Sequence, residues 1–375
     1  MDLLVLSEVR WGYFRTRKQF LLSRFPEPWR VFFAQPPAFG ADDPWTPRRE
    51  GNVTYFTVPF LKPGTTSAPY NALAATPPGR AFIERAAETW LRSRLRALGV
   101  EPRPVVLASN IYCPGALSRL SRKLVLYDFN DSPFQFSRTP NWAGDYWKRT
   151  RDQVDAFFVV SEYYRRQLAA ETQRPLMTLG NGVEYEAFST PRPEPADLAR
   201  LPRSRIGYVG LLSHFLDFDV LEALRRARGQ GTLVLIGPDT PATAGRLAEF
   251  ARREGVALLG ARPYADVPAY LQALDLGVIP FRAQDPHVQG INPNKVYQYL
   301  AAGLPVITTP ILDLDPAPPH LQFAAESSEW TRAAAAALSS PGDRVTRRAL
   351  ARPHDWDAIA ARFVAEIERL AAAAA

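Results

Sequence analysis

The sequence contains a single cysteine, Cys113, among its 375 residues. One cysteine excludes an internal disulfide framework and provides no partner thiols for a cysteine-ligated zinc site. The sequence also lacks any apolar run that approaches the ~20 residues a membrane-spanning helix needs. Its first seven residues, MDLLVLS, carry no basic segment and are too short for a signal peptide, so they predict a β-strand instead. These absences favour a cytoplasmic protein.

Charge is moderate in amount but unevenly distributed along the chain. Residues 1–190 contain 25 Lys and Arg against 18 Asp and Glu, whereas residues 191–375 contain 20 of each kind. The formal net charge of +7 therefore belongs to the first half. Such an excess indicates an acidic partner or a membrane surface for that half, or it serves only solubility.

The length predicts more than one domain, and the composition, 46% hydrophobic and 22% charged, is typical of globular proteins. A proline-rich segment at 189–204 is predicted to be a linker. It would separate an N-terminal domain, residues 1–188, from a C-terminal domain, residues 205–355. A final helix, residues 356–375, is expected to pack back on the N-terminal domain.

Apolar runs without polar alternation predict strands that helices bury on both faces, as in parallel sheets. In the first half these runs are Leu3–Leu6, Arg30–Ala34, Val53–Val58, Val105–Ala108, Leu124–Tyr127 and Phe157–Val160. In the second half they are Ile206–Val209, Thr232–Ile236, Val256–Leu259, Leu276–Ile279 and Val306–Thr308. A helix over Arg80–Leu98 is predicted to bury Phe82, Ala86, Trp90 and Leu95. Strands alternate with helices through the second half, which indicates right-handed βαβ units.

A candidate anion site begins at Asn292, in the segment NPNKVYQYLAAGLPVITT. Pro293 suits the first turn of a helix, and Gly303 stands where a left-handed cap would end it. The start of a helix offers free backbone N–H groups and a partial positive charge, to which Lys295 adds a formal charge. This arrangement suits the phosphates of a nucleotide donor. The alternative is an ordinary helix between two strands.

The segment 8–20 follows the first strand and mixes aromatic with basic residues, including Trp11, Arg15 and Arg17. It could bind an anionic acceptor or contact a membrane, since ligand sites form at the carboxyl ends of strands in α/β folds. The alternative is a basic helical turn with Trp11 in the core. A membrane-facing helix would use four cations and four apolar residues. These are Arg15, Arg17, Lys18 and Arg24, with Phe14, Phe20, Leu21 and Phe25.

Asp128 and Asp131 follow another predicted strand. No third acidic residue or histidine lies nearby in the sequence, which argues against a metal site. Asp131 is interpreted as a carboxylate that faces the cleft, and Asp128 as a helix or loop cap.

The motifs together resemble those of glycosyltransferases of the GT-B fold, close to group 1 or family 4. The matching segments occur in the family's order: IGYVG at 206–210, LVLIGP at 233–238, LGARPY at 259–264, LGVIPF at 276–281, and NPNK with YLAAGLPV at 292–306. The segments VSE at 160–162 and NGV at 181–183 match the end of the family's first domain. The N-terminal loop is similar to that of a polysaccharide-synthesis branch. The resemblance implies an α/β protein with two Rossmann-like parallel-sheet domains that face a cleft.

By this resemblance the C-terminal domain binds the donor and the N-terminal domain binds the acceptor. The donor-binding residues would be Gly210, Ser213, His214, Gly237, Arg262, Tyr264, Arg282, Asn292, Lys295, Val296 and Gln298. The acceptor-side residues would be Trp11, Arg15, Arg17 and Asp128. Lys295 would stabilise the leaving diphosphate, and Asp131 is the candidate base for the acceptor hydroxyl. No metal and no cofactor is expected.

Two departures from the family pattern limit what the resemblance implies. Gly290 and Gln298 stand where the family has two glutamates eight residues apart, so neither retention nor inversion of the anomeric configuration is implied. Ser213 and His214 replace the usual arginine and lysine after Gly210, which would leave Arg262 or Arg282 to help neutralise the diphosphate.

The expected function is transfer of a hexosyl-type sugar from a nucleotide diphosphate-sugar to a glycan or lipid-linked acceptor, in cell-surface polysaccharide synthesis. The expected partners are this donor, this acceptor and the inner face of the cell membrane, and no nucleic acid. Two alternatives stay open. One is a non-catalytic nucleotide-sugar-binding partner of a synthesis complex, and the other is a GT-B sugar-nucleotide epimerase.

Overall fold

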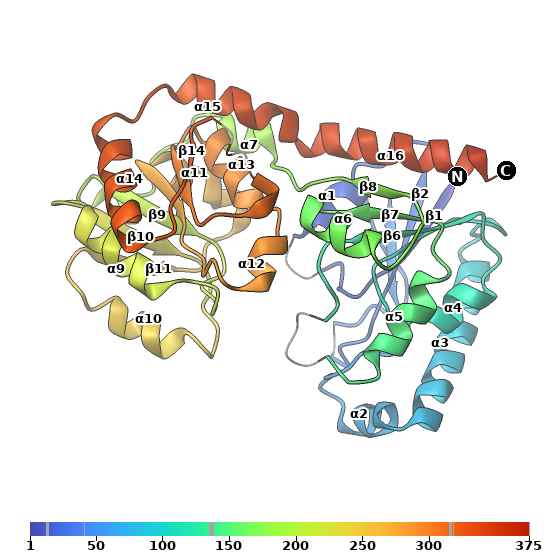
Figure 1. The fold of residues 1–375 in the computed structure, drawn as a ribbon. Helices are drawn as coiled ribbons and strands as arrows, with labels where there is room; N and C mark the ends of the chain where they lie inside the picture. The colour runs from blue at the N-terminus through green and yellow to red at the C-terminus, as the bar shows by residue number, and fades with distance from the viewer. Residues whose placement is uncertain (13–14, 41, 135–138, 315–316, 318, 375) are drawn as a thin grey trace. The chain divides into compact units, whose positions relative to one another are not determined.

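The computed structural model describes residues 1–374 except 13–14, 41, 135–138, 315–316 and 318. The described chain forms two compact units. Unit 1 comprises Met1–Gly180 with Ile359–Ala375, and unit 2 comprises Asn181–Ala358. Each unit is a largely parallel sheet with helices on both faces (Figure 1). The predicted α/β class with two Rossmann-like parallel sheets is confirmed.

The sheet of unit 1 has the strand order β3-β4-β2-β1-β5-β6-β7-β8, and β3 alone among these strands runs antiparallel to its neighbour. The strands are β1 (Asp2–Leu6), β2 (Arg30–Gln35), β3 (Arg48–Glu50), β4 (Val53–Thr57), β5 (Val105–Ala108), β6 (Leu124–Phe129), β7 (Ala156–Val159) and β8 (Leu176–Thr178). The six predicted strands are present within one or two residues at each end. The order reverses between β1 and β5, and ligand sites of open α/β sheets form at such a point.

Helices cover both faces of this sheet (Figure 1). They are α1 (Arg17–Leu22), α2 (Ala68–Ala75), α3 (Pro77–Ala97), α4 (Pro114–Arg119), α5 (Ala143–Arg151), α6 (Glu162–Ala169) and α16 (Trp356–Ala373). Phe363 of α16 packs against Phe158 of β7 and Phe25 beside α1, with ring centroids 4.4 and 6.0 Å apart. The indole of Trp29 also donates to Glu368 at 3.0 Å. The C-terminal helix therefore completes the face of the sheet that α1 covers.

Helix α3 buries a different stripe from the predicted one. Ile83, Ala87 and Leu91 face the core, whereas Phe82 is 65% exposed. Trp90 is half-buried and donates its indole N–H to the Thr57 carbonyl at 3.1 Å. The prediction was right for Leu95, which is buried, and wrong for Phe82, because the sequence offers two apolar series at helical spacing and the sheet selects one of them.

The sheet of unit 2 is parallel, with the order β11-β10-β9-β12-β13-β14. Its strands are β9 (Arg205–Val209), β10 (Thr232–Ile236), β11 (Val256–Gly260), β12 (Leu276–Ile279), β13 (Val306–Thr308) and β14 (Leu321–Phe323). Its α-helices are α7 (Tyr185–Ser189), α8 (Ala196–Ala199), α9 (Phe218–Ala227), α10 (Ala244–Phe250), α11 (Val267–Gln272), α12 (Pro286–Gly290), α13 (Asn294–Ala301), α14 (Ser327–Ser339) and α15 (Arg344–Ala351). The order reverses between β9 and β12.

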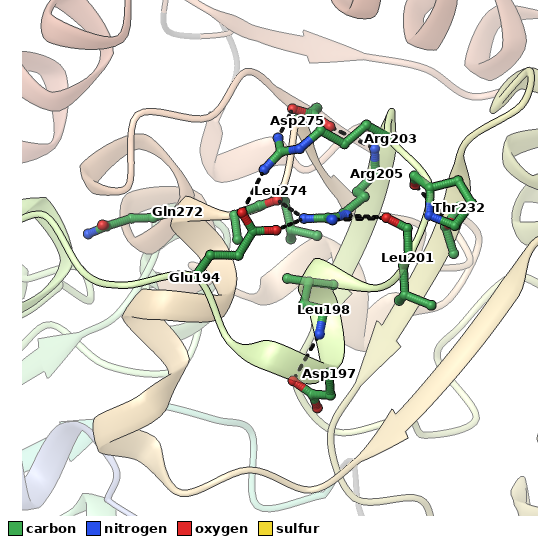
Figure 2. Close-up of polar contacts among 12 residues, drawn as sticks. Glu194, Asp197, Leu198, Leu201, Arg203, Arg205, Thr232, Gln272, Leu274 and Asp275 are labelled. Carbon is green, nitrogen blue, oxygen red and sulfur yellow. Dashed lines mark hydrogen bonds and ion pairs between the residues drawn. The ribbon is translucent and has the colours of Figure 1, made fainter.

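The proline-rich segment is part of unit 2, and the units divide at Gly180, eight residues before the predicted domain end. Gln272 donates to the carbonyls of Phe188 and Thr190 at 2.8 and 2.7 Å. Glu194 accepts from Arg203 and from the buried Arg205, which also donates to the Leu201 carbonyl (Figure 2). The prolines of the segment leave few backbone N–H groups for regular structure. These side-chain hydrogen bonds therefore hold the segment on unit 2.

Candidate functional site

Unit 1 contains a cavity of about 420 Å³ at the carboxyl ends of β1 and β5, where the strand order reverses. Glu8 and Val9 follow β1, and Ser109 and Asn110 follow β5. The further lining residues are Thr16, Arg17, Lys18, Pro36, Leu61, Lys62, Pro63, Ile111, Tyr112, Tyr127, Asp128, Asn130, Asp131, Pro133 and Thr139. A cavity of this size, with mixed apolar and charged walls, suits a small polar ligand such as a sugar.

Lys18 and Glu8 form an ion pair of 2.6 Å in the cavity wall. Glu8 also accepts a hydrogen bond from the Ser109 hydroxyl. Burial acts to lower the pKa of Lys18, but Glu8 and Asp128 together outweigh that effect and raise it. Lys18 therefore stays protonated, and its positive charge lies in the cavity wall rather than on the protein surface.

Asp131 is a carboxylate of the cavity with a raised pKa. Burial raises the pKa of Asp131 to about 6, although the charge of Lys18 opposes this shift. Asn130 donates to its Oδ2 at 2.8 Å. A carboxylate with a pKa near 6 is mostly ionised at neutral pH and is a stronger base than an ordinary aspartate. This geometry fits the predicted role of Asp131, which stays a prediction.

Several cavity residues were not among the predicted site residues: Glu8, Ser109, Tyr112 and Lys62 are examples. Glu8 and Ser109 directly follow predicted strands, so their positions gave a signal. Lys62 and Tyr112 lie in loops, and only the fold brings them here. Burial and the charge of Arg10 lower the pKa of Lys62. Within the described residues Lys62 has no ion pair, so its ammonium is available to an anionic or hydroxyl-bearing ligand.

Two of the predicted acceptor-side residues form a buried ion pair with each other. Nε of Arg17 lies 3.1 Å from Oδ1 of Asp128, and both side chains are 3% exposed. Arg17 also donates to the Gly180 carbonyl at 2.8 Å. The interpretation of Asp128 as a cap was wrong, because its carboxylate is used to neutralise Arg17. Asp128 and Arg17 thus support the cavity floor.

Trp11 lies in the core, as the alternative interpretation stated. Its indole N–H donates to Glu50 at 2.9 Å, and its ring stacks on Tyr55 and meets the edge of Phe33. Arg15 is exposed, with its guanidinium 5.5 Å from the Phe20 ring. Arg15 therefore remains the accessible member of the predicted acceptor group.

The helix predicted to face a membrane does not present its residues outward. Within it Arg17, Lys18, Phe20, Leu21 and Phe25 are buried, which contradicts the prediction for those residues. Phe14 lies outside the described residues. None of the described helices is both long enough and apolar enough to cross a membrane. Peripheral contact through other basic surfaces of unit 1 stays a prediction.

In unit 2, Lys295 lies over the loop that follows β9. Its Nζ is 5.7 Å from the centroid of the Tyr208 ring. Gly210 has φ +147, and a Cβ there would stand 2.2 Å from Cε of Lys295. Only glycine therefore permits this backbone and this close approach. Burial lowers the pKa of Lys295 to about 8. No described residue forms an ion pair with its ammonium.

The other predicted donor residues near Lys295 play different structural roles. A Cβ on Gly237 would stand 1.9 Å from the Gly210 carbonyl oxygen, so the two glycines meet as predicted sites of close approach. Val296 is fully buried, and its N–H is taken by the Pro293 carbonyl at 3.1 Å. Asn292 accepts from the Asn181 N–H at 2.8 Å and so holds the start of unit 2. Gln298 is also buried in α13, at 8% exposure.

The loop after Gly210 contains two of the predicted donor residues, one of them buried and the other exposed. Ser213 is buried, and its hydroxyl accepts from the Phe215 N–H at 3.4 Å. His214 is exposed beside the ring of Phe215, which stacks on His287 with centroids 4.7 Å apart. Arg282 is half-exposed and lies 3.8 Å from Asp285. His214 and Arg282 are thus accessible, whereas Ser213 shapes the loop.

Arg262 and Tyr264 lie after β11. Arg262 pairs with Asp197 at 2.7 Å and donates to the Tyr270 hydroxyl at 2.7 Å. Tyr264 places its ring 6.0 Å from that of Phe188. The guanidinium of Arg262 is therefore engaged within unit 2, so a donor diphosphate would have to compete with Asp197 for it.

Residues 203–339 match the family model described as glycosyl transferases group 1. A protein of Bacillus subtilis (strain 168), provisionally described as a teichuronic acid biosynthesis glycosyltransferase, is 26% identical over 223 residues. That match covers 56% of this chain and 56% of the relative, so the chain spans little more than half the relative's length. The resemblance predicted from the sequence is confirmed.

The fold of the whole chain is similar to that of solved GT-B structures. Sucrose-phosphate synthase from Thermosynechococcus elongatus superimposes with a TM-score of 0.70 at 16% identity, covering 99% of each chain. The Anabaena protein HepE, solved in complex with UDP, has a TM-score of 0.68 at 16% identity and covers 98% of this chain and 100% of its own. An Escherichia coli trehalose-6-phosphate protein bound with UDP-2-fluoro glucose has a TM-score of 0.68 at 12% identity, covering 98% of this chain and 99% of its own. At these identities the likeness shows the fold alone.

Proposed function

We propose that this chain, whose residues 203–339 match glycosyl transferases group 1, moves a sugar from a nucleotide diphosphate-sugar to an acceptor. Unit 2 would bind the donor, and the cavity of unit 1 would bind the acceptor. The proposal includes a hexosyl donor, since two of the solved structures of this fold are named with UDP or a UDP-sugar analogue. A glycan or lipid-linked acceptor of cell-surface polysaccharide synthesis is supported by the description of the Bacillus relative.

One observation carries the proposal: the ammonium of Lys295, without an ion-pair partner among the described residues, lies against the backbone of Gly210. The first turn of α13 leaves backbone N–H groups beside it. A half-buried cation without a counter-ion is costly, and an anionic ligand lowers that cost. In transfer chemistry the leaving diphosphate gains charge, so a preorganised cation at this place stabilises the transition state more than the ground state.

The acceptor hydroxyl would be deprotonated by Asp131, whose pKa of about 6 fits a general base at neutral pH. A second candidate function, that of a non-catalytic nucleotide-sugar-binding partner, is supported by Gln298, which stands where the family has a glutamate. An amide can bind ribose hydroxyls but cannot carry a negative charge.

The function is tested with a panel of nucleotide diphosphate-sugars, beginning with UDP-glucose. Native mass spectrometry identifies which donor binds, and release of the nucleoside diphosphate with and without glycan acceptors measures turnover. An enzyme releases nucleotide slowly by hydrolysis and faster with its acceptor. Binding without any release identifies the non-catalytic partner, and a protein that binds no donor on the panel contradicts the proposal.

A further inference from the structure

Unit 2 contains a second cavity, of about 440 Å³, at the amino ends of the strands β9, β12 and β13. Lys295 lies at the carboxyl ends of the same strands, so the two sites occupy opposite edges of the sheet. The cavity wall consists of Arg203, Ser204, Asp275, Pro305, Leu338, Pro341, Gly342, Arg344 and Arg347. Three of these residues are arginines and one is acidic. Nothing in the transfer reaction proposed above uses this edge.

The acidic residue of the cavity is already neutralised. Asp275 accepts from Arg203 at 3.0 Å and from the backbone N–H of Arg205 at 2.8 Å (Figure 2). Arg203 turns its other terminal nitrogen to Glu194 at 3.2 Å (Figure 2). Asp275 and Glu194 are thus committed to Arg203 and Arg205, which leaves no carboxylate of this network for the arginines of α15.

The two arginines of α15 that line the cavity, Arg344 and Arg347, donate only to carbonyls. Arg347 is 1% exposed, and it donates to the carbonyls of Gly303 and Pro341. Arg344 donates to the carbonyls of Gln272 and Leu274 at 3.3 and 3.4 Å. Carbonyls satisfy N–H groups but leave the positive charge uncompensated. A covered guanidinium without an anion is costly, and such groups are ordinarily paired.

One further carboxylate, Asp343, lies close to Arg347 in the chain, but its oxygens cap α15. They accept from the backbone N–H groups of Val345 and Thr346 and from the Thr346 hydroxyl at 2.6 Å. No described carboxylate makes an ion pair with Arg344 or Arg347. Burial and the neighbouring charge of Arg344 lower the pKa of Arg347. The cavity therefore carries a positive charge that the described residues do not balance.

We propose that this cavity binds the phosphate group of a small molecule between Arg344 and Arg347. Guanidinium groups match the geometry of phosphate oxygens, and paired donors fix its orientation. The volume exceeds that of a single phosphate ion and lies in the range of small-molecule sites, so a phosphorylated sugar fits as well as free phosphate. The site is independent of donor binding at Lys295.

The test uses the full chain carrying Lys295→Ala, which weakens anion binding at the opposite edge. Isothermal titration calorimetry with inorganic phosphate, pyrophosphate and glucose 6-phosphate then measures the affinity of the second cavity for each ligand. We expect saturable binding, and we expect Arg344→Gln in this background to weaken it roughly tenfold or more, as loss of a charged hydrogen bond would. Arg332→Gln, on the exposed face of α14, is the matched control and leaves the affinity unchanged. Tighter binding of glucose 6-phosphate than of inorganic phosphate identifies a phosphorylated sugar, and equal binding identifies free phosphate.

Thermal unfolding separates a binding role of Arg344 from a structural one. Phosphate should raise the melting temperature of the Lys295→Ala protein and should fail to raise that of the doubly substituted protein. The proposal is overturned if no probe binds at tens of millimolar. It is also overturned if Arg344→Gln lowers the melting temperature equally with and without phosphate while the affinity is unchanged.

Discussion

Nε of Arg17 and Oδ1 of Asp128, which are 111 residues apart in the sequence, lie 3.1 Å apart beneath the cavity of unit 1. Helix α1 carries the arginine, and β6 carries the aspartate. Both side chains are almost fully covered, so the pair offsets the cost of burying its two charges. The pair ties the helix after the first strand to the centre of the sheet, and it fixes the position of the neighbouring Lys18.

Replacing one partner of this pair should destabilise unit 1 strongly. Asp128→Asn or Arg17→Met should lower the free energy of unfolding by about 3–5 kcal/mol, because one charge stays buried after losing the ion-pair partner that lies 3.1 Å away. Arg166→Met, which breaks a surface pair with Glu162, should cost no more than about 1 kcal/mol. Urea unfolding, followed by the fluorescence of the tryptophans, measures all three. The double variant Arg17→Met/Asp128→Leu should be more stable than either single one, and additive losses would contradict this account.

Most strands of both sheets could be predicted because buried parallel strands are nearly continuous apolar runs. The short strand β14 was not predicted. β3 escaped prediction because its sequence is Arg-Arg-Glu and its residues are exposed. β8, with three residues that include a threonine at its end, gave an equally weak pattern. The buried face of α3 shows a further limit of prediction from sequence. Phe82 and Ile83 are equally good core candidates in sequence, and the choice between them depends on where the sheet lies.

Asp131, Gly210 and Lys295 could be proposed as site residues from the sequence because each follows a strand or opens a helix, where backbone geometry makes ligand sites. Glu8 and Ser109 could not be joined to Asp131, because their proximity depends on β1 pairing with β5 across about a hundred residues. The commitment of Arg262 to Asp197 and of Arg17 to Asp128 also depends on tertiary contacts. Sequence indicates which residues can bind an anion, whereas the fold determines which of them are already paired.

Lys295→Ala should reduce turnover while leaving the fold intact. Loss of one preorganised cation at the leaving group should cost about 2–4 kcal/mol of transition-state stabilisation, or roughly 30- to 1,000-fold in kcat/KM. Lys148→Ala, on the exposed side of α5, is the control and should change the rate less than twofold. Rates of nucleotide release under single-turnover conditions measure the effect. Activity of Lys295→Ala within threefold of the unsubstituted protein would remove Lys295 from the mechanism.

Turnover should persist in excess EDTA, since the proposed mechanism meets the diphosphate charge with Lys295 and helix N–H groups rather than with a metal. Asp128, near the end of β6, is engaged with Arg17. The described residues also contain no cluster of three His, Cys, Asp or Glu side chains arranged to hold a metal ion. The measurement compares rates before and after chelation and after re-addition of Mg²⁺ or Mn²⁺. Activity that EDTA abolishes and either ion restores would show a metal-dependent transferase.

The pH dependence of kcat/KM should report the two perturbed groups of the free protein. Asp131, with its pKa raised by burial to about 6, acts as a base only when ionised, so the rate should fall about tenfold per pH unit below 6. Lys295, with its pKa lowered by burial to about 8, attracts the donor only when protonated, so the rate should also fall above pH 8.

Asp131→Asn should lower kcat roughly 10²- to 10⁴-fold and remove the acid limb while the alkaline limb stays. Asp145→Asn, on the exposed side of α5, should keep both limbs. An acid limb that survives in Asp131→Asn would assign the base to another group, and Glu8, in the same cavity, would be the next to substitute.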